Sequence, residues 1–355
     1  MEKLYIDYKK KQNKNKLILL ILFLFVIIMS FVCLFVGSSN ISFIECIKGL
    51  FNLSSEVNNR IILNIRLPRV LACLICGAGL SISGLIMQTT LSNSMASPST
   101  LGVSNAAVFG ANLSIIISAG GFFYTSNNVN KYLESANPYT TSLMAFIFSI
   151  LSILLILVLC KIKLFSPNVV ILSGIAIGSI WNALTTILQY CASDVGLSSA
   201  VIWNFGDLSR ATYKEDIIMG VVVLIGFIYF MINAWNYNGL LSGDNVSKSL
   251  GINVNLLRGI SLLLASLICA VCVSFLGIIG FVGVICPHIM KRILGNDHRY
   301  LIPASLLSGS LLLLISDTIS RSILNGSALP VGAITSLLGA PFFLYIIFSR
   351  KGIYA

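Results

Sequence analysis

Long apolar runs separated by short polar segments dominate the chain. An apolar run of about 20 residues is long enough to cross the hydrocarbon core of a bilayer as an α-helix. Ten stretches fit this pattern, and we predict them as transmembrane helices at about residues 17–36, 67–91, 101–118, 141–160, 169–191, 216–235, 257–277, 279–294, 301–320 and 331–349. The expected fold is all-α, a polytopic membrane protein.

The division between the seventh and eighth helices rests on helix length. No formally charged residue lies between Gly259 and Met290, a stretch of 32 residues. As one straight helix it would be about 48 Å long, against a hydrocarbon core of about 30 Å. Gly277, Gly280, Gly283 and Pro287 favour a break, so we predict one span followed by a shorter returning one.

The distribution of basic residues predicts the orientation. With both ends of the chain inside, 15 of the 23 Lys and Arg residues lie on the inner side and 8 on the outer side, as the positive-inside rule requires. We therefore expect a cytoplasmic basic tail at 1–16, one transmembrane domain at 17–349 and a cytoplasmic tail at 350–355.

Composition excludes several classes of protein. Apolar residues make up 57% of the chain and charged residues 10%, whereas soluble domains carry about 25% charged residues. An ordinary water-soluble enzyme is excluded. The net charge of +11 does not indicate a nucleic-acid partner, because the basic residues lie between apolar runs rather than on one water-exposed face.

The cysteines indicate neither a disulfide framework nor a metal site. There are nine, an odd number, mostly inside apolar segments. Cys73 and Cys76, and likewise Cys269 and Cys272, form C-x-x-C pairs in uncharged runs without nearby His or carboxylate ligands. We interpret them as small apolar side chains and expect no metal site.

The chain has no G-x-x-x-x-G-K-[ST] motif, so we expect no ATPase activity of its own. The other common energy source is an ion gradient, which depends on ionisable groups in the membrane. Asp317 is the main acidic residue within a predicted span, and it lies four residues before Arg321. That spacing favours a local ion pair over a proton relay, although an ion-coupled secondary transporter stays an alternative.

The most specific pattern begins at Arg66-Leu67-Pro68-Arg69, where a proline suits the first turn of a helix. Gly77, Ser81 and Gly84 follow about one turn apart. Small residues at this spacing are typical of a close helix–helix contact in lipid. Asn93-Ser94-Met95-Ala96-Ser97-Pro98 and Leu101-Gly102-Val103-Ser104 come next.

In these motifs, and over residues 60–350 as a whole, the chain resembles the FecCD/BtuC family. Its members are the permease subunits of type II ABC importers for iron–siderophore complexes, haem and vitamin B12. The likeness continues through Leu250–Val254, Gly277–His288, Asp297–Arg299, Asp317-Thr318, Leu329–Thr335 and Leu338–Phe343. One departure is mild: members commonly have Asn-Pro-Leu-Ala-x-Pro where this chain has Asn93-Ser94-Met95-Ala96-Ser97-Pro98.

The resemblance implies a BtuC-like fold of ten helices that works as a homodimer or heterodimer in the bacterial plasma membrane. It also implies two ATPase subunits, which bind ATP and Mg²⁺, and an extracytoplasmic substrate-binding protein. This chain would be no enzyme and would hold no cofactor. We expect an iron(III)-siderophore-type chelate as cargo, with haem or vitamin B12 as alternatives.

The resemblance also implies roles for particular residues. Arg66, Arg69 and Arg321 would dock the binding protein, with interfacial anchoring as the alternative role. An inner loop at about 236–257 would form short coupling helices against the ATPase, with Gly251 at the bend between them, or else be a plain connector. Its expected coupling residues are Asp244, Ser247, Lys248, Leu250 and Gly251, and the expected inner gate is Ser166, Pro167 and Asn168.

His288 and His298 are the only histidines, and both fall on the predicted inner side. We expect structural or surface roles for them rather than metal binding, because a siderophore already satisfies its iron.

Overall fold

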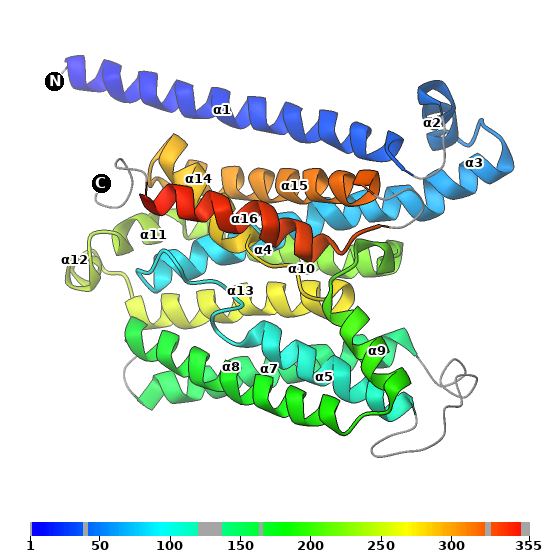
Figure 1. Cartoon of the computed structure of the whole chain (residues 1–355). Coiled ribbons are helices and arrows are strands. Elements are labelled where there is room, and N and C mark those ends of the chain that lie inside the picture. The colour runs from blue at the N-terminus through cyan, green and yellow to red at the C-terminus, as the bar shows by residue number, and fades with distance from the viewer. Residues whose placement is uncertain (1, 38–41, 120–136, 163–165, 324–327, 349–355) are drawn as a thin grey trace.

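The computed structural model describes residues 2–37, 42–119, 137–162, 166–323 and 328–348. Within these ranges the regular structure is helical, and the long helices run roughly parallel to one another (Figure 1). Each predicted span has a helix: α1 (Glu2–Phe35), α4 (Leu67–Thr90), α5 (Val103–Ser118), α7 (Pro138–Ile162), α8 (Pro167–Tyr190), α10 (Tyr213–Ile232), α13 (Val254–Leu276), α14 (Val282–Leu294), α15 (His298–Ile323) and α16 (Val331–Phe348).

The helices differ in how readily each would cross a bilayer alone. Among the described residues, seven helical segments are long and apolar enough to do so. The helices α5 and α16 are shorter but apolar, and α14 has only 13 residues. The first helix starts at Glu2, so no break separates the predicted tail at 1–16 from the first span.

Short helices lie at the two ends of the bundle. At one end are α11 (Ala234–Leu240) and α12 (Asp244–Ser249), and this is also the end at which α1 starts and α16 finishes (Figure 1). The opposite end carries α2 (Phe43–Leu50), α3 (Glu56–Ile61) and α9 (Asp194–Asn204). Helix α3 continues through a π-helical turn η1 (Ile62–Arg66) into α4, and a short turn η2 (Leu208–Arg210) precedes α10.

Helix α4 runs through the centre of the bundle and is almost entirely buried. Its small residues permit the closest contacts: a methyl group on Gly77 would overlap the backbone of Gly309 in α15, and one on Gly84 would overlap Gly283 in α14. Two glycines facing each other let the helix backbones touch. The predicted contact of Gly77, Ser81 and Gly84 is therefore confirmed.

The predicted break after Gly277 is also confirmed. Helix α13 ends at Leu276, and Gly277 adopts a φ of +79° that glycine reaches without strain. The backbone N–H of Asp207 donates to the Leu276 carbonyl oxygen, with 2.8 Å between nitrogen and oxygen. The chain returns as α14, so two shorter helices replace one helix too long for the membrane.

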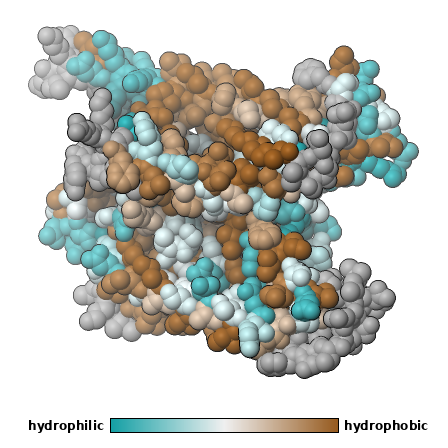
Figure 2. All heavy atoms as spheres, viewed as in Figure 1, coloured by the Kyte–Doolittle hydropathy of each residue, from teal (hydrophilic) through white to brown (hydrophobic). Residues whose placement is uncertain are grey.

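Apolar side chains cover much of the surface between the two ends. Figure 2 shows them gathered over α1 and α16, with hydrophilic residues at the ends of the bundle and in the lower middle of this face. The exposed large side chains on α1, α7, α8 and α10 are mostly apolar, which is the surface a bilayer requires.

Candidate functional site

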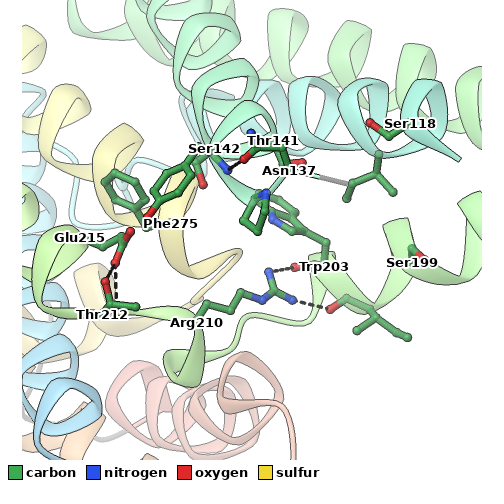
Figure 3. Close-up of a pocket in the computed structure, with 14 residues that line it drawn as sticks. Ser118, Asn137, Thr141, Ser142, Ser199, Trp203, Arg210, Thr212, Glu215 and Phe275 are labelled. Atoms are coloured by element: carbon green, nitrogen blue, oxygen red, sulfur yellow. Dashed lines mark hydrogen bonds between the residues drawn. The ribbon is translucent and has the colours of Figure 1, made fainter. Parts of the chain in front are cut away.

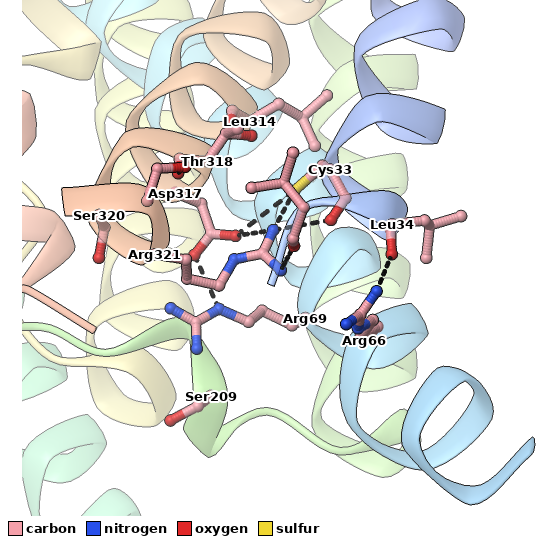
Figure 4. Close-up of polar contacts among 12 residues, drawn as sticks. Cys33, Leu34, Arg66, Arg69, Ser209, Leu314, Asp317, Thr318, Ser320 and Arg321 are labelled. Carbon is pink, nitrogen blue, oxygen red and sulfur yellow. Dashed lines mark hydrogen bonds and ion pairs between the residues drawn. The ribbon is translucent and has the colours of Figure 1, made fainter. Parts of the chain in front are cut away.

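A cluster of charged residues joins α1, α4 and α15 at the end of the bundle that carries α2 and α3 (Figure 4). Asp317 is fully buried, and its Oδ1 lies 2.7 Å from Nε of Arg69. Its Oδ2 lies 2.9 Å from Nη2 of Arg321. The predicted pair of Asp317 with Arg321 is therefore present. The partner Arg69 is 248 residues away in sequence, so spacing could not reveal it.

Arg66 and Arg321 donate hydrogen bonds to the end of α1. Nη1 of Arg66 donates to the carbonyl oxygens of Leu34 and Phe35, at 2.7 and 3.0 Å. Arg321 donates to the carbonyls of Cys33 and Val36, at 2.8 and 2.6 Å. The last four carbonyls of a helix lack partners within it and carry partial negative charge. Two guanidinium groups thus satisfy the carbonyls where α1 ends.

The cluster retains more positive than negative charge. Three guanidinium groups lie around the Asp317 carboxylate, with the Asp207 carboxylate acting on Arg69 at longer range. Arg66 and Arg69 are only 4% and 8% exposed. Nη2 of Arg69 and Nε of Arg321 are buried without a hydrogen-bond partner among the described residues. Figure 4 shows the guanidinium group of Arg69 between Asp317 and Ser209 of η2. The three predicted docking residues are thus brought together, and Arg69 and Arg321 each keep one nitrogen without a hydrogen-bond partner among the described residues.

At the opposite end, α12 is fixed to the bundle by one buried arginine. Arg258 of α13 makes two hydrogen bonds of 2.7 Å to the carboxylate of Asp244. Its Nε donates to the carbonyl oxygen of Thr90, at the end of α4. The hydrogen bonds from Arg258 lower the pKa of Asp244 below its ordinary value of 3.8. Arg258 was not among the predicted site residues, because nothing in the local pattern indicates its partners.

The predicted short helices are present, but one bend was misplaced. Gly251 does have a positive φ of +82°, yet it lies between α12 and α13. The bend between α11 and α12 is made by Gly243, with a φ of +95°. The Ser247 hydroxyl donates to the carbonyls of Gly239 and Gly243, which braces that bend. Sequence alone could not decide which of the two glycines separates the short helices.

The outer surface of α12 is both apolar and basic. Val246 and Leu250 are 47% and 66% exposed, and Lys248 is exposed beside them. Of the five predicted coupling residues, Asp244 and Ser247 therefore hold the helix in place, whereas Lys248 and Leu250 face outward. Such an exposed patch at the end of a helix bundle is typical of a contact with another protein.

His298 ties α11 to α4 and α15. Its Nδ1 lies 2.8 Å from Oδ1 of Asn238, and its Nε2 lies 2.8 Å from the Thr89 hydroxyl. Burial by itself would raise the pKa of Asp297, but hydrogen bonds from Arg299 and Asn238 lower it below 3.8. In the described part of the chain, no group of three His, Cys, Asp or Glu residues is arranged to hold a metal ion. The ring of His298 is thus part of the scaffold.

The predicted gate residues lie where α8 begins, at the same end as α12 (Figure 1). Ser166 and Pro167 are half-buried and Asn168 is exposed. The gate itself stays a prediction, since it depends on a second permease subunit.

Comparison with known proteins agrees with this architecture. The sequence pattern of the FecCD transport family matches residues 22–349. An ABC transporter permease protein of Methanocaldococcus jannaschii is 42% identical, with 90% of each chain covered. The iron(3+)-hydroxamate import system permease FhuG of Bacillus subtilis is 32% identical, covering 96% of this chain and 98% of its own. The hemin transport system permease HmuU of Yersinia pestis is 32% identical, covering 92% and 95%.

The fold is also similar to a solved structure. A metal-chelate type ABC transporter in an inward-facing conformation superimposes with a TM-score of 0.80 and 27% identity. The match covers 93% of this chain and 98% of that one.

Proposed function

The chain belongs to the FecCD transport family of ABC transporter permeases, and on that premise we propose that it carries an iron(III)-siderophore-type chelate across the bacterial plasma membrane. As a permease subunit it is the multi-pass, non-catalytic membrane component of an importer. ATP and Mg²⁺ belong to a separate ATPase subunit in this proposal. Both termini face the cytoplasm, in keeping with the excess of basic residues on that side.

One structural observation supports a coupled mechanism above all. Helices α4 and α15 carry both the arginine cluster at one end and the attachments of α11 and α12 at the other. They touch directly at Gly77 and Gly309. A signal at the outer end and a nucleotide-driven signal at the inner end therefore act on the same pair of helices. Each ligand shifts such a two-state element only by its unequal affinity for the two states.

We propose that Arg66, Arg69 and Arg321 dock an acidic surface of the extracytoplasmic binding protein. The excess of guanidinium groups over carboxylates, and the unpartnered N–H groups, support this proposal. Charge pairs of this kind govern encounter rate and register. Their deep burial implies that the partner's carboxylates insert into the cluster or that the end of α1 moves aside.

Docking is tested with Arg66→Gln, which leaves both ion pairs of Asp317 in place. The control is Arg60→Gln, because Arg60 lies at the same end but is 73% exposed and pairs only locally with Glu56. We expect Arg66→Gln to weaken binding-protein affinity at low salt by about tenfold, and Arg60→Gln to leave it unchanged. Equal affinities for the two variants would remove Arg66 from the docking surface and leave interfacial anchoring as its role.

The inner partners are proposed to be two ATPase subunits beneath a homodimer or heterodimer of permeases. The exposed side chains of α12 support a contact of this kind. Ser166, Pro167 and Asn168 are proposed as the inner gate, where small polar groups can separate without breaking buried ion pairs. The pathway would bind its cargo weakly, so that the chelate is released rather than held.

Uptake into proteoliposomes that contain the complete importer tests the cargo and the energy source together. We expect ATP-dependent uptake of a ferric siderophore, faster than that of haem or cobalamin. Relatives include permeases named for iron hydroxamate and for hemin, so faster haem or cobalamin uptake would reassign the cargo. Uptake that persists without ATP but stops when the proton gradient collapses would instead favour an ion-coupled transporter.

A further inference from the structure

Away from the arginine cluster and from α12, two adjoining cavities lie between the first turns of α7 and α10. Their volumes are about 540 and 560 Å³. They share the lining residues Tyr139, Ser142, Glu215 and Phe275 (Figure 3). Because they share these residues, the two cavities lie side by side near the α9 end of the bundle.

The first cavity has both apolar and polar walls, and the guanidinium group of Arg210 lies in one of them. Nη1 and Nη2 of Arg210 donate to the carbonyl oxygens of Trp203 and Ile202, at 3.3 and 3.1 Å. The guanidinium carbon lies 5.8 Å from the centre of the Trp203 ring. Within the described ranges, no carboxylate lies at ion-pair distance from Arg210. Its guanidinium group is thus held in place by two carbonyl groups, and the carboxylate of Asp207 acts on it electrostatically from beyond ion-pair distance.

The carboxylate of Glu215 also lines this cavity, but its Oε2 is occupied. Both the backbone N–H and the hydroxyl of Thr212 donate to it, the former at 2.8 Å. Lys214, at the edge of the second cavity, adds another cation. Two cations, Arg210 and Lys214, and one carboxylate, Glu215, thus line the site, and the Asp207 carboxylate acts on Arg210 from outside it. The two basic side chains offer N–H donors to an anionic ligand.

The second cavity is apolar and faces the bilayer. It is lined by Leu143, Phe146, Ile218, Val271 and Phe275. The neighbouring surfaces of α7 and α10 expose Ile147, Ile217 and Val221. A hydrocarbon chain entering between these helices would lie beside the acyl chains of the surrounding lipid.

We propose that this site binds an anionic phospholipid, with its phosphate at Arg210 and Lys214 and one acyl chain between α7 and α10. Guanidinium groups bind phosphate oxygens through several N–H donors at once. Trp203 and Tyr139 lie where aromatic side chains favour the membrane interface. The two basic side chains and the apolar walls of the two cavities match the head and the tail of one amphiphile, whereas a soluble anion would leave the apolar walls without a ligand.

The test uses the whole chain purified in mild detergent, with bound lipid counted by native mass spectrometry. Phosphatidylglycerol is titrated first, followed by diacylglycerol and inorganic phosphate. Arg210→Gln should weaken phosphatidylglycerol binding by about fivefold, the effect expected for one basic residue near an anionic lipid. Diacylglycerol lacks the phosphate. Its affinity for the unmodified chain should therefore be no higher than the affinity of phosphatidylglycerol for Arg210→Gln.

Three further variants separate binding from folding. Arg210 also bonds carbonyls at the end of α9, so Arg210→Lys keeps the charge and should restore most of the binding. Ser142→Trp fills the wall shared by the two cavities and should reduce lipid binding with Arg210 intact. Arg60→Gln, outside the cavity, should change nothing. Equal lipid retention by Arg210→Gln and Arg60→Gln would overturn the proposal, as would displacement of the lipid by inorganic phosphate alone.

A second copy of this chain is the other candidate occupant of the groove. If Ser142→Trp converted a dimer to a monomer without changing the bound lipid, the groove would be a subunit interface, and the lipid assignment would be wrong.

Discussion

The buried carboxylates Asp317 and Asp216 have opposite electrostatic surroundings. Asp317 is paired with Arg69 and Arg321. Asp216, on α10, is 3% exposed, and neither of its oxygens has a hydrogen-bond partner among the described residues. Removing one partner of a buried ion pair is costly, whereas neutralising an unpartnered buried carboxylate relieves a cost.

We therefore predict opposite effects for two chemically identical substitutions. Asp317→Asn should destabilise the protein by about 3 kcal/mol or more, because it leaves two buried guanidinium groups without a counter-charge. Asp216→Asn should be neutral or stabilising. Thermal unfolding in detergent measures both. A larger loss for Asp216→Asn than for Asp317→Asn would contradict the roles assigned to these two carboxylates.

The pairing of Asp244 with Arg258 predicts a pH dependence at α12. Its pKa in the folded protein is below the ordinary value of 3.8, so its contribution is present above that value and is lost as the pH falls through the folded pKa. The Asp244 side chain is 43% exposed, and solvent screening limits the contribution to about 1 kcal/mol.

Hydrogen exchange of the α12 amides checks this expectation. Exchange should accelerate as the pH falls from about 4 to about 2, after correction for the intrinsic pH dependence of exchange. In Asp244→Asn the corrected protection should already be low and should vary little over that range. If the wild-type protein and Asp244→Asn showed the same corrected exchange over this pH range, the pair of Asp244 with Arg258 would not hold α12 in place.

At the scale of elements, the position of α4 depends on small residues. The spacing of Gly77, Ser81 and Gly84 indicated a close contact in lipid, and that part of the packing was readable from sequence. Their partners, Gly309 and Gly283, could not be predicted from the sequence, because a contact between helices joins residues distant in sequence.

A methyl group is the smallest probe of this contact. Gly309→Ala should destabilise the protein by about 1–3 kcal/mol, because the added carbon overlaps the Gly77 carbonyl of α4 and forces the backbones apart. Gly220→Ala on α10 is the matched control, since its nearest neighbour would be Cδ1 of Ile75 at 3.6 Å. Similar thermal unfolding of the two variants would contradict the close packing of α4 against α15.

At the scale of the whole molecule, α4 and α15 link the two ends of the bundle. We predict that Val246→Asp on α12 lowers ATPase stimulation and transport in the reconstituted importer by about tenfold, because a buried unpaired charge at an interface costs more than 1.4 kcal/mol. Binding-protein affinity, measured on the permease without its ATPase, should not change, since the arginine cluster lies at the opposite end.

Leu256→Asp provides the control for this prediction. Leu256 is 59% exposed in the first turn of α13, near the same end but outside α12. Equal losses for the two variants would show that the contact is not specific to α12. Unchanged coupling in Val246→Asp would remove this helix from the ATPase interface.

The sequence by itself determined the helical class, the positions of the membrane spans and the break after Gly277, because span length, apolar runs and glycine act over neighbouring residues. It also identified the small residues of α4 and the pair of Asp317 with Arg321, which share one helix face. Only the tertiary structure decided that Arg69 pairs with Asp317, that Arg258 joins Asp244 to Thr90, and that Gly243 rather than Gly251 separates the short helices. These contacts join distant parts of the chain, and electrostatic and hydrogen-bond partners are fixed by distance in space, which local patterns do not encode.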